Sequence, residues 1–302
     1  MRAVRIHKRG GSDGLVLEDA PLPHAATGDV VVEVRAAGFV PDELEWPATW
    51  VDRAGRDRTP SIPAHEVAGV VSEVRYGTSG LAVGDRVFGL TDWHRDGAAA
   101  EYVAVEARNL ALMPESLTYV QAAALPLAGL TAWQGLFAHG GLKPGQRVVV
   151  HGAGGGTGVM AVQLAREAGA EVIATGRGRA AEVAMEMGAQ TFVDLERERF
   201  EDVEAVDLVF DTIGGELLER SAAKVKPGGA LVSVTAPPPV RPEEGRALFF
   251  IVEPNRDQLA ELGRRAEAGR LRPHVGAVHP LAETKAAFQG KRGVPGKIVL
   301  EI

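Results

Sequence analysis

The feature that most constrains the fold is a glycine-rich turn between an apolar segment and a helix-like one. The turn reads GAGGGTG at residues 152–158 and follows the apolar run Arg147–His151. After the turn, Ala161, Leu164 and Ala165 recur at the spacing of one helix face. The N–H groups at such a helix N-terminus, next to glycines, can bind phosphate. The segment therefore predicts the first βα unit of a dinucleotide-binding domain.

The spacing of the glycines fits a relaxed form of the dinucleotide-binding motif. The strict pattern G-x-G-x-x-G fails from Gly152 because Thr157 stands at its last position, whereas Ala153, Gly155 and Gly158 satisfy the relaxed version. The alternative is a tight turn with a structural role only. The strand, the helix and the repeated βα units around the turn all favour dinucleotide binding, so we expect these five residues to contact the cofactor.

Downstream of residue 118, strand-like and helix-like segments alternate. This alternation is typical of a doubly wound parallel sheet with helices on both faces, the Rossmann arrangement. The expected strands are Arg147–His151, Glu171–Thr175, Thr191–Val193, Asp207–Asp211 and Ala230–Thr235, and helices are expected at Val120–His139 and Gln258–Ala268. We assign residues 119–270 to this domain.

Upstream, short strands such as Val67–Val74 and Arg86–Leu90 follow one another without intervening helices. That pattern favours an antiparallel, barrel-like domain. The last strand, Lys297–Ile302, comes after Pro273 and Pro280, which suggests an exit from the parallel sheet. We therefore predict an α/β protein of two domains, with residues 1–118 and 271–302 forming the barrel.

The end of the second strand of the parallel sheet indicates which dinucleotide is bound. An NAD site usually carries an acid there, which holds the ribose 2′-hydroxyl. Here the strand runs into Gly176, Arg177, Gly178 and Arg179, with no carboxylate. A guanidinium suits a 2′-phosphate because its planar fork can bind it through two hydrogen bonds. We expect NADPH, the alternative being that both arginines are solvated loop residues.

The composition excludes several classes of function. The net charge of -7 argues against a nucleic-acid partner or an acidic membrane surface, since both need a positive field. The chain has no cysteine, which excludes disulfides, iron–sulfur clusters and thiolate zinc sites. No apolar run suits a signal peptide or a membrane span, so the expected location is cytoplasmic.

Motifs are spread along nearly the whole chain. They are HEVAGVV at 65–71, GDRVF at 84–88, AEYV at 100–103, LPLAGLTA at 125–132, the glycine turn, DLVFD at 207–211, GG at 214–215, PGG at 227–229 and GKIVL at 296–300. In this order, they resemble the medium-chain dehydrogenase/reductase superfamily in its zinc-independent, quinone-oxidoreductase-like branch. The resemblance implies a partly opened, GroES-like β-barrel as the catalytic domain, a Rossmann domain for the cofactor, a cleft between them and a homodimer.

The resemblance also implies roles for individual residues. Thr131 corresponds to a hydroxyl residue beside the nicotinamide, Arg177 to the contact with the 2′-phosphate, and Lys297 lies in a segment that often approaches the cofactor. Residues expected to line the nicotinamide and its ribose are Val234, Thr235, Phe249, Phe250 and Val252.

Zinc is not expected. Zinc-dependent members of the superfamily bind the metal through a cysteine, a histidine and a third ligand, whereas this chain has Val40 about where the cysteine would stand. His65 and Glu66, with an acid at 42 or 43, are a poor ligand set. Val40 also replaces the asparagine of the Asn-Pro-x-Asp segment found in many zinc-free members, which leaves the roles in this loop open.

The acceptor pocket is expected in loops of the first domain. Trp46, Trp50 and Trp93 could supply flat apolar walls for a ring, or could pack beneath the loops. His94 could donate a proton to a developing oxyanion, or could be a surface residue. The expected reaction is hydride transfer from NADPH to a small molecule, a quinone or an α,β-unsaturated carbonyl. An enoyl-thioester reductase and a non-catalytic NADPH-binding redox sensor are the alternatives.

Overall fold

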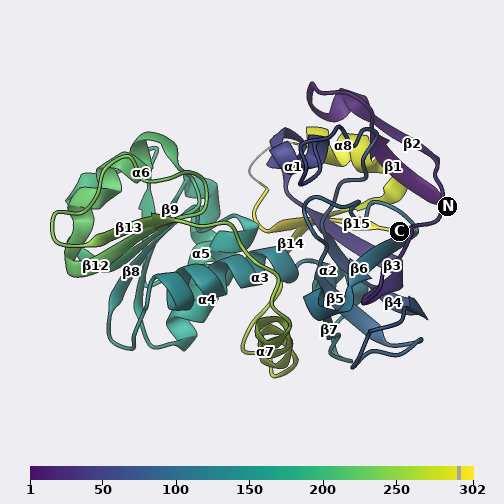
Figure 1. Cartoon of the computed structure of the whole chain (residues 1–302). Coiled ribbons are helices and arrows are strands. Elements are labelled where there is room, and N and C mark those ends of the chain that lie inside the picture. Colours follow the sequence, from purple (N-terminus) through teal and green to yellow (C-terminus); the bar gives the residue numbers. More distant parts are fainter. Residues whose placement is uncertain (291–293) are drawn as a thin grey trace. The chain divides into compact units, whose positions relative to one another are not determined.

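Two larger sheets and one two-stranded ribbon organise the chain in the computed structural model, which describes residues 1–290 and 294–302 (Figure 1). The first of two compact units contains residues 1–127, 254–268 and 273–302, and the second contains residues 128–253 and 269–272. Each unit is built around one of the larger sheets. The predicted fold class, a barrel-like domain with a Rossmann domain, is confirmed.

The sheet of the second unit is parallel throughout, with the strand order β10-β9-β8-β11-β12-β13. Its strands are β8 (Arg147–His151), β9 (Glu171–Gly176), β10 (Thr191–Asp194), β11 (Val206–Asp211), β12 (Val225–Ser233) and β13 (Arg246–Phe249). In chain order this is 3-2-1-4-5-6, so the direction of winding changes between β8 and β11. Ligands of such sheets bind at this switch point, outside the carboxyl ends of the strands.

Helices cover both faces of this parallel sheet (Figure 1). Successive strand residues point to opposite faces, and Val149, Val209 and Leu231 pack on one face against Leu217 and Leu218. Those leucines belong to α6 (Gly215–Ser221), while α4 (Gly156–Glu167) contacts β8 and β9. The remaining helical segments are α3 (Pro126–Trp133), the π-helical turn Gln134–His139, and α5 (Ala181–Glu186).

The main sheet of the first unit has the strand order β14-β15-β3-β4-β5-β7, and β6 also pairs with β3. These strands are β3 (Asp29–Phe39), β4 (Glu66–Val74), β5 (Arg86–Leu90), β6 (Tyr102–Glu106), β7 (Leu110–Leu112), β14 (Val275–Pro280) and β15 (Lys297–Glu301), and the separate ribbon is β1 (Arg2–Ile6) with β2 (Leu15–Asp19). All pairs except β14 with β15 are antiparallel. β15 pairs with β3, so the last strand lies in the sheet of the first unit.

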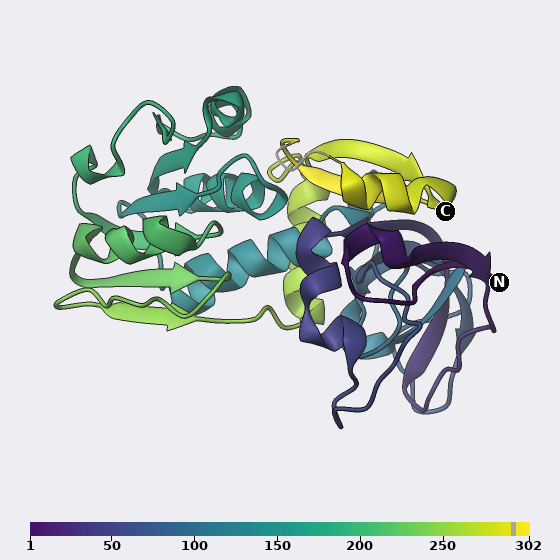
Figure 2. The same cartoon turned by 90° about the horizontal axis from the view of Figure 1, so that it is seen from above.

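The two ends of the chain lie side by side within the first unit, as both views show (Figures 1 and 2). Helix α8 (Thr284–Gln289) contacts β2, and Phe288 stacks on Phe39 with the ring centroids 4.1 Å apart. The other helices of this unit are α1 (Pro47–Trp50), α2 (Tyr119–Ala123) and α7 (Arg256–Glu267).

The borders of the compact units differ from the predicted domains 1–118, 119–270 and 271–302. Helix α7 belongs to the first unit because it contacts β7, and Arg256 donates hydrogen bonds to the carbonyls of Ala107 and Leu110. The single helix predicted at Val120–His139 is wrong in detail. Pro126 begins a new helix there, so the segment is divided into α2, α3 and a π-helical turn. In the described part of the chain, no helix is long and apolar enough to cross a bilayer.

Candidate functional site

The glycine turn lies at the switch point of the parallel sheet, between β8 and α4. Gly152 has a φ of 76°, and a Cβ there would lie 2.4 Å from the hydroxyl of Thr212, so this position requires glycine. A Cβ at Gly158 would lie 2.1 Å from the carbonyl oxygen of Gly152, so helix and turn are in close contact. These glycines shape the turn itself.

Gly155, the N-cap of α4, differs from its neighbours. Its φ is −76°, and a Cβ there would meet only the carbonyl oxygen of Gly152 at 3.4 Å. Open space therefore lies in front of the helix start, where the first N–H groups of Gly156, Thr157 and Gly158 have no partners within an α-helix. The turn fits a pyrophosphate, and the predicted phosphate contacts lie together here.

A buried polar network supports the turn from below. His151, at the end of β8, contacts the hydroxyl of Thr175 through Nδ1 at 2.8 Å and that of Ser221 through Nε2 at 2.9 Å. Burial lowers the pKa of His151 to about 4, so the ring is neutral at neutral pH. Asp211 accepts hydrogen bonds from the backbone N–H of Gly214 and from the hydroxyl of Ser233. The network joins the carboxyl ends of β8, β9, β11 and β12, and the sequence analysis missed it.

The predicted 2′-phosphate contacts lie just beyond β9. Arg177 is exposed, and its Nε lies 3.8 Å from a carboxylate oxygen of Glu196. Arg179 is also exposed and follows two positions later. Asp194, at the end of β10, was not predicted from the sequence, and its Oδ2 would lie 2.7 Å from a Cβ at Gly178. Asp194 accepts the N–H of Glu196 at 3.1 Å, so its carboxylate already has a partner.

The residues expected to line the nicotinamide follow two neighbouring strands of the second unit. Ser233 and Phe249 pair at the ends of β12 and β13, and Val234 with Thr235 follows one strand end while Phe250 and Val252 follow the other. Phe250 and Val252 are buried, while Thr235 is exposed. Thr131 is buried on α3.

Gln134 holds the segment from Phe250 to Glu253 in place, a role that the sequence did not predict. Its side-chain amide donates to the carbonyl of Glu253 at 2.8 Å, and its oxygen accepts the N–H of Glu253 at 3.1 Å. The ring of His139 lies 4.4 Å from that of Phe250, centroid to centroid. The chain from Phe250 to Glu253 is therefore fixed by side chains of the π-helical turn.

Lys297 lies inside the barrel of the first unit. Its ammonium forms a buried ion pair with Glu66, and Glu66 also accepts the N–H of Leu127 at 2.9 Å. Glu43 accepts the N–H of Ala64, which has a φ of 68°. Burial raises the pKa of the Glu43 carboxyl to about 7, an effect that nearby Lys297 opposes. The structure gives Lys297 an ionic partner that the sequence did not predict.

Two of the predicted tryptophans form a pair, and the third does not join it. The rings of Trp46 and Trp93 meet edge to face, with centroids 5.4 Å apart at 90°, and both are half-buried. Trp93 also meets His65, with centroids 5.2 Å apart. Trp50 does not have the role expected for it as a wall of the acceptor pocket. Its side chain is buried in the barrel core, and its indole N–H donates to the carbonyl of Leu44. It is not available to an acceptor.

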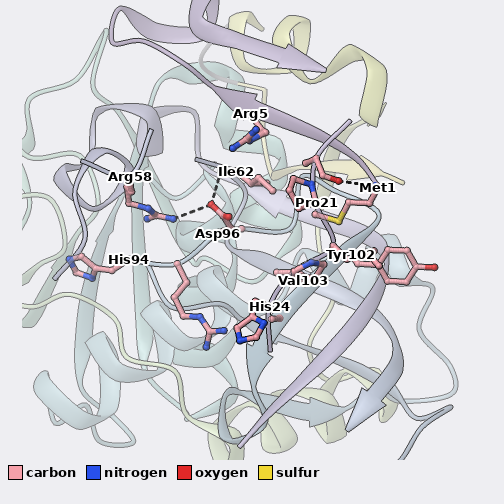
Figure 3. A pocket seen from close by; sticks show the side chains of 16 residues that line it. Met1, Arg5, Pro21, His24, Arg58, Ile62, His94, Asp96, Tyr102 and Val103 are labelled. Atoms are coloured by element: carbon pink, nitrogen blue, oxygen red, sulfur yellow. Dashed lines mark hydrogen bonds and ion pairs between the residues drawn. The ribbon is translucent and has the colours of Figure 1, made fainter. Parts of the chain in front are cut away.

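His94 lies at a pocket of about 440 Å³ in the first unit (Figure 3). It shares one side of this pocket with Arg58, and Asp96 also lines it. The N–H of His94 donates to Asp92 at 2.8 Å, and its side chain is about one-third exposed. Trp46 and Trp93 are not among the residues that line this pocket.

The possible zinc ligands do not form a zinc site. His65 contacts the hydroxyl of Thr91 at 2.7 Å, and burial lowers its pKa to about 3. Glu66 and Glu43 are engaged with Lys297 and Ala64. Within residues 1–290 and 294–302, no three histidine or acidic side chains converge as a metal site would require. The donor set does not fit zinc.

Comparison with known proteins agrees with this architecture. Residues 26–115 match the model of the alcohol dehydrogenase GroES-like domain, and residues 187–300 match that of the zinc-binding dehydrogenase family. The chain is 32% identical to the 2-methylene-furan-3-one reductase of Solanum lycopersicum, over 94% of this chain and 74% of that protein. It is 31% identical to the NADPH-dependent alkenal/one oxidoreductase, chloroplastic, of Arabidopsis thaliana, over 95% of this chain and 75% of that protein.

Among solved structures, the quinone oxidoreductase of Coxiella burnetii superimposes with a TM-score of 0.93 and is 27% identical. The match covers 100% of this chain and 99% of that one. Whole-chain similarity at these levels extends over both units. The chain belongs to the medium-chain dehydrogenase/reductase superfamily, in its quinone-oxidoreductase-like branch of nicotinamide-dependent oxidoreductases.

Proposed function

We propose that the protein is an NADPH-dependent reductase of quinones and α,β-unsaturated carbonyls that works without zinc. The observation that carries this proposal is the glycine turn, where the space in front of Gly155 is open and the next strand, β9, is followed by Arg177 rather than by an acid. Positive charge at that position favours the cofactor with a 2′-phosphate. The names of the related reductases and of the similar solved structure support the two acceptor classes.

The residues of the chain mainly bind and orient. Gly155, Thr157 and Gly158 would hold the pyrophosphate, and Arg177 with Arg179 would hold the 2′-phosphate. When bound, the reduced nicotinamide supplies a hydride, that is, two electrons and one proton. The segment that Gln134 fixes, from Phe250 to Glu253, would keep the nicotinamide in one orientation.

The acceptor gains negative charge on oxygen as it takes up the hydride. An enone becomes an enolate and a quinone becomes a hydroquinone anion, so one proton from solution completes either reaction. Water would supply this proton, because His94 lines a pocket that the tryptophan pair does not line. The half-buried pair of Trp46 and Trp93 would supply an apolar wall for a flat acceptor.

A homodimer is part of the proposal. β13 is an edge strand of the parallel sheet, with no further strand beside it among the described residues. Phe249, the last residue of β13, is 37% exposed and Ile251 just after it is 66% exposed, so apolar surface accompanies this sheet edge. Light scattering on the purified protein should give twice the mass of one chain.

The test of function is the oxidation of NADPH and NADH in the presence of a panel of acceptors. The panel contains a naphthoquinone, a short linear enone, an enoyl thioester and a simple alcohol–ketone pair. We expect turnover with the quinone and the enone, and with NADPH in preference to NADH. Turnover with the thioester alone would assign the protein to the enoyl-thioester reductases. Tight NADPH binding without turnover of any acceptor would indicate a redox sensor.

A further inference from the structure

Arg58 joins two loops of the first unit that carry the tryptophan pair. One nitrogen of its guanidinium, Nη1, donates to the carbonyl of Ala48 at 2.6 Å and to that of Trp93 at 3.0 Å. The other, Nη2, lies 3.4 Å from a carboxylate oxygen of Asp96, as the dashed line in Figure 3 shows. One side chain thus connects α1 with the loop that contains residues 91–97.

The guanidinium is held in place rather than solvated. The Arg58 side chain is only 11% exposed, whereas that of Arg56, two residues away, is 79% exposed and pairs with Asp52. Burial lowers the pKa of Arg58, and the charge of Asp96 opposes this effect only in part. Because a buried cation is costly without hydrogen bonds, the two carbonyl contacts are required for this side chain to stay where it is.

The two tethered segments are those that set the geometry of the tryptophan pair. Trp46 is the residue before α1, two positions from Ala48, and Trp93 supplies one of the tethered carbonyls itself. Their edge-to-face contact is formed across 47 positions of sequence, so it depends on how these loops are held together. A shift of either loop would separate the rings or rotate them.

We propose that Arg58 is a positioning residue of the acceptor site, which fixes Trp46 and Trp93 as a wall for flat, conjugated acceptors. This inference rests on the proposed function. Arg58 does not touch the acceptor and acts through the two tryptophans. A two-ring quinone would lie against both indoles and depend on their geometry, whereas a short linear enone is too small to contact both.

The kinetic test compares Arg58→Met, Arg58→Lys and the control Arg56→Met. Methionine keeps the unbranched, apolar side chain but removes the donors, and lysine can still donate to a carbonyl. We expect Arg58→Met to raise KM for a naphthoquinone about tenfold while KM for the linear enone stays within twofold. Arg58→Lys should raise the same KM only about threefold. The control Arg56→Met should behave as wild type. Equal increases in KM for both acceptors, or no increase for either, would overturn the proposal.

A spectroscopic test is independent of activity. Indoles that are held in a fixed, asymmetric environment give near-UV circular dichroism, and Trp46→Phe should remove the part of this signal that comes from the pair. Arg58→Met should lose most of that part while far-UV spectra remain those of the folded protein. If Arg58→Met does not fold, Arg58→Lys is used, and it should lose part of the signal. A full signal in the folded variant would overturn the proposal. A wild type that reduces no acceptor would overturn the proposed function, and the signal would still show whether Arg58 holds the pair.

Discussion

Lys297 neutralises Glu66 inside the barrel, where the two side chains are 7% and 1% exposed. The carboxylate of Glu66 also accepts the N–H of Leu127, so its charge has both an ionic and a hydrogen-bonding partner. A buried ion pair of this kind adds little to the free energy of unfolding, compared with apolar residues of similar size at the same two positions. Removing only one member is costly, because the other charge remains buried.

Lys297→Met should therefore destabilise the protein by roughly 3–5 kcal/mol. The double variant Lys297→Met with Glu66→Gln should recover much of this loss, since no uncompensated charge remains. Urea unfolding of the three proteins measures the difference. A single variant as stable as wild type would show that Lys297 does not serve as the counter-ion of Glu66.

The buried carboxyl of Glu43 should make stability fall as the pH rises. Its pKa is raised to about 7 from the ordinary value of 4.5, so the folded state binds more protons than the unfolded state between these values. The free energy of unfolding should decrease through this window by about 3 kcal/mol. Two buried histidines, His65 and His151, act in the opposite direction below pH 6.5, because burial keeps them neutral in the fold.

The contribution of Glu43 is isolated by comparison with Glu43→Gln, which keeps an acceptor for the N–H of Ala64. The free energy of unfolding of this variant minus that of wild type should increase from pH 4.5 to 7 and remain constant above pH 7. Denaturant unfolding across this range is the measurement. A difference between the two proteins that does not vary with pH would contradict the assigned pKa.

NADPH should bind at least tenfold more tightly than NADH, which corresponds to about 1.4 kcal/mol. The reason is the positive end of β9, where Arg177 stands in place of an acid. Arg177→Ala should remove most of this preference. Arg197→Ala is a suitable control, because that exposed side chain lies near Asp194 on the neighbouring strand end. Fluorescence titration with both cofactors decides the matter, and equal affinities in wild type would refute the assignment.

The purified protein should contain no stoichiometric zinc, and chelators should leave its activity unchanged. His65 and Glu66, the positions that resemble zinc ligands, are engaged with Thr91 and Lys297 in the structure. Elemental analysis showing one zinc per chain would contradict this prediction. Loss of activity on treatment with EDTA, restored by zinc, would do the same.

Much of the fold followed from periodicity and glycine positions. The strand Arg147–His151 was predicted because its apolar run specifies it, and the return of the last strand was predicted from Pro273 and Pro280 before it. The position of α7 could not be predicted. The contacts of Arg256 with the carbonyls of Ala107 and Leu110 join segments about 150 residues apart, and no local pattern records them.

Side-chain environments were less predictable than strands. Trp46 and Trp50 are equally plausible wall residues in sequence, yet only the fold shows that the indole of Trp50 donates inward to Leu44. Similarly, the clamp between Gln134 and Glu253 spans 119 positions and pairs a side chain with the backbone. Backbone acceptors carry no sequence signal, so a glutamine that uses them cannot be distinguished from any other glutamine.

The central claim, that a dinucleotide binds at the glycine turn, is tested most directly with Gly155. A valine there fits the observed φ of −76° and ψ of 166°, and its Cβ meets no atom closer than 3.4 Å, so the fold should persist. The branched side chain would instead fill the space in front of the helix start. Gly154→Val is a contrasting variant, because its Cβ would lie 2.5 Å from that of Ala180 and should destabilise the protein without any cofactor.

The decisive measurement is thermal unfolding of wild type and Gly155→Val, each with and without NADPH. Wild type should gain stability with the logarithm of the cofactor concentration by mass action, by about 2.7 kcal/mol at a hundred times Kd. Gly155→Val should unfold near the wild-type temperature without cofactor and show no gain with it. A variant that keeps the full NADPH-induced shift would show that the dinucleotide binds elsewhere, and would contradict the account.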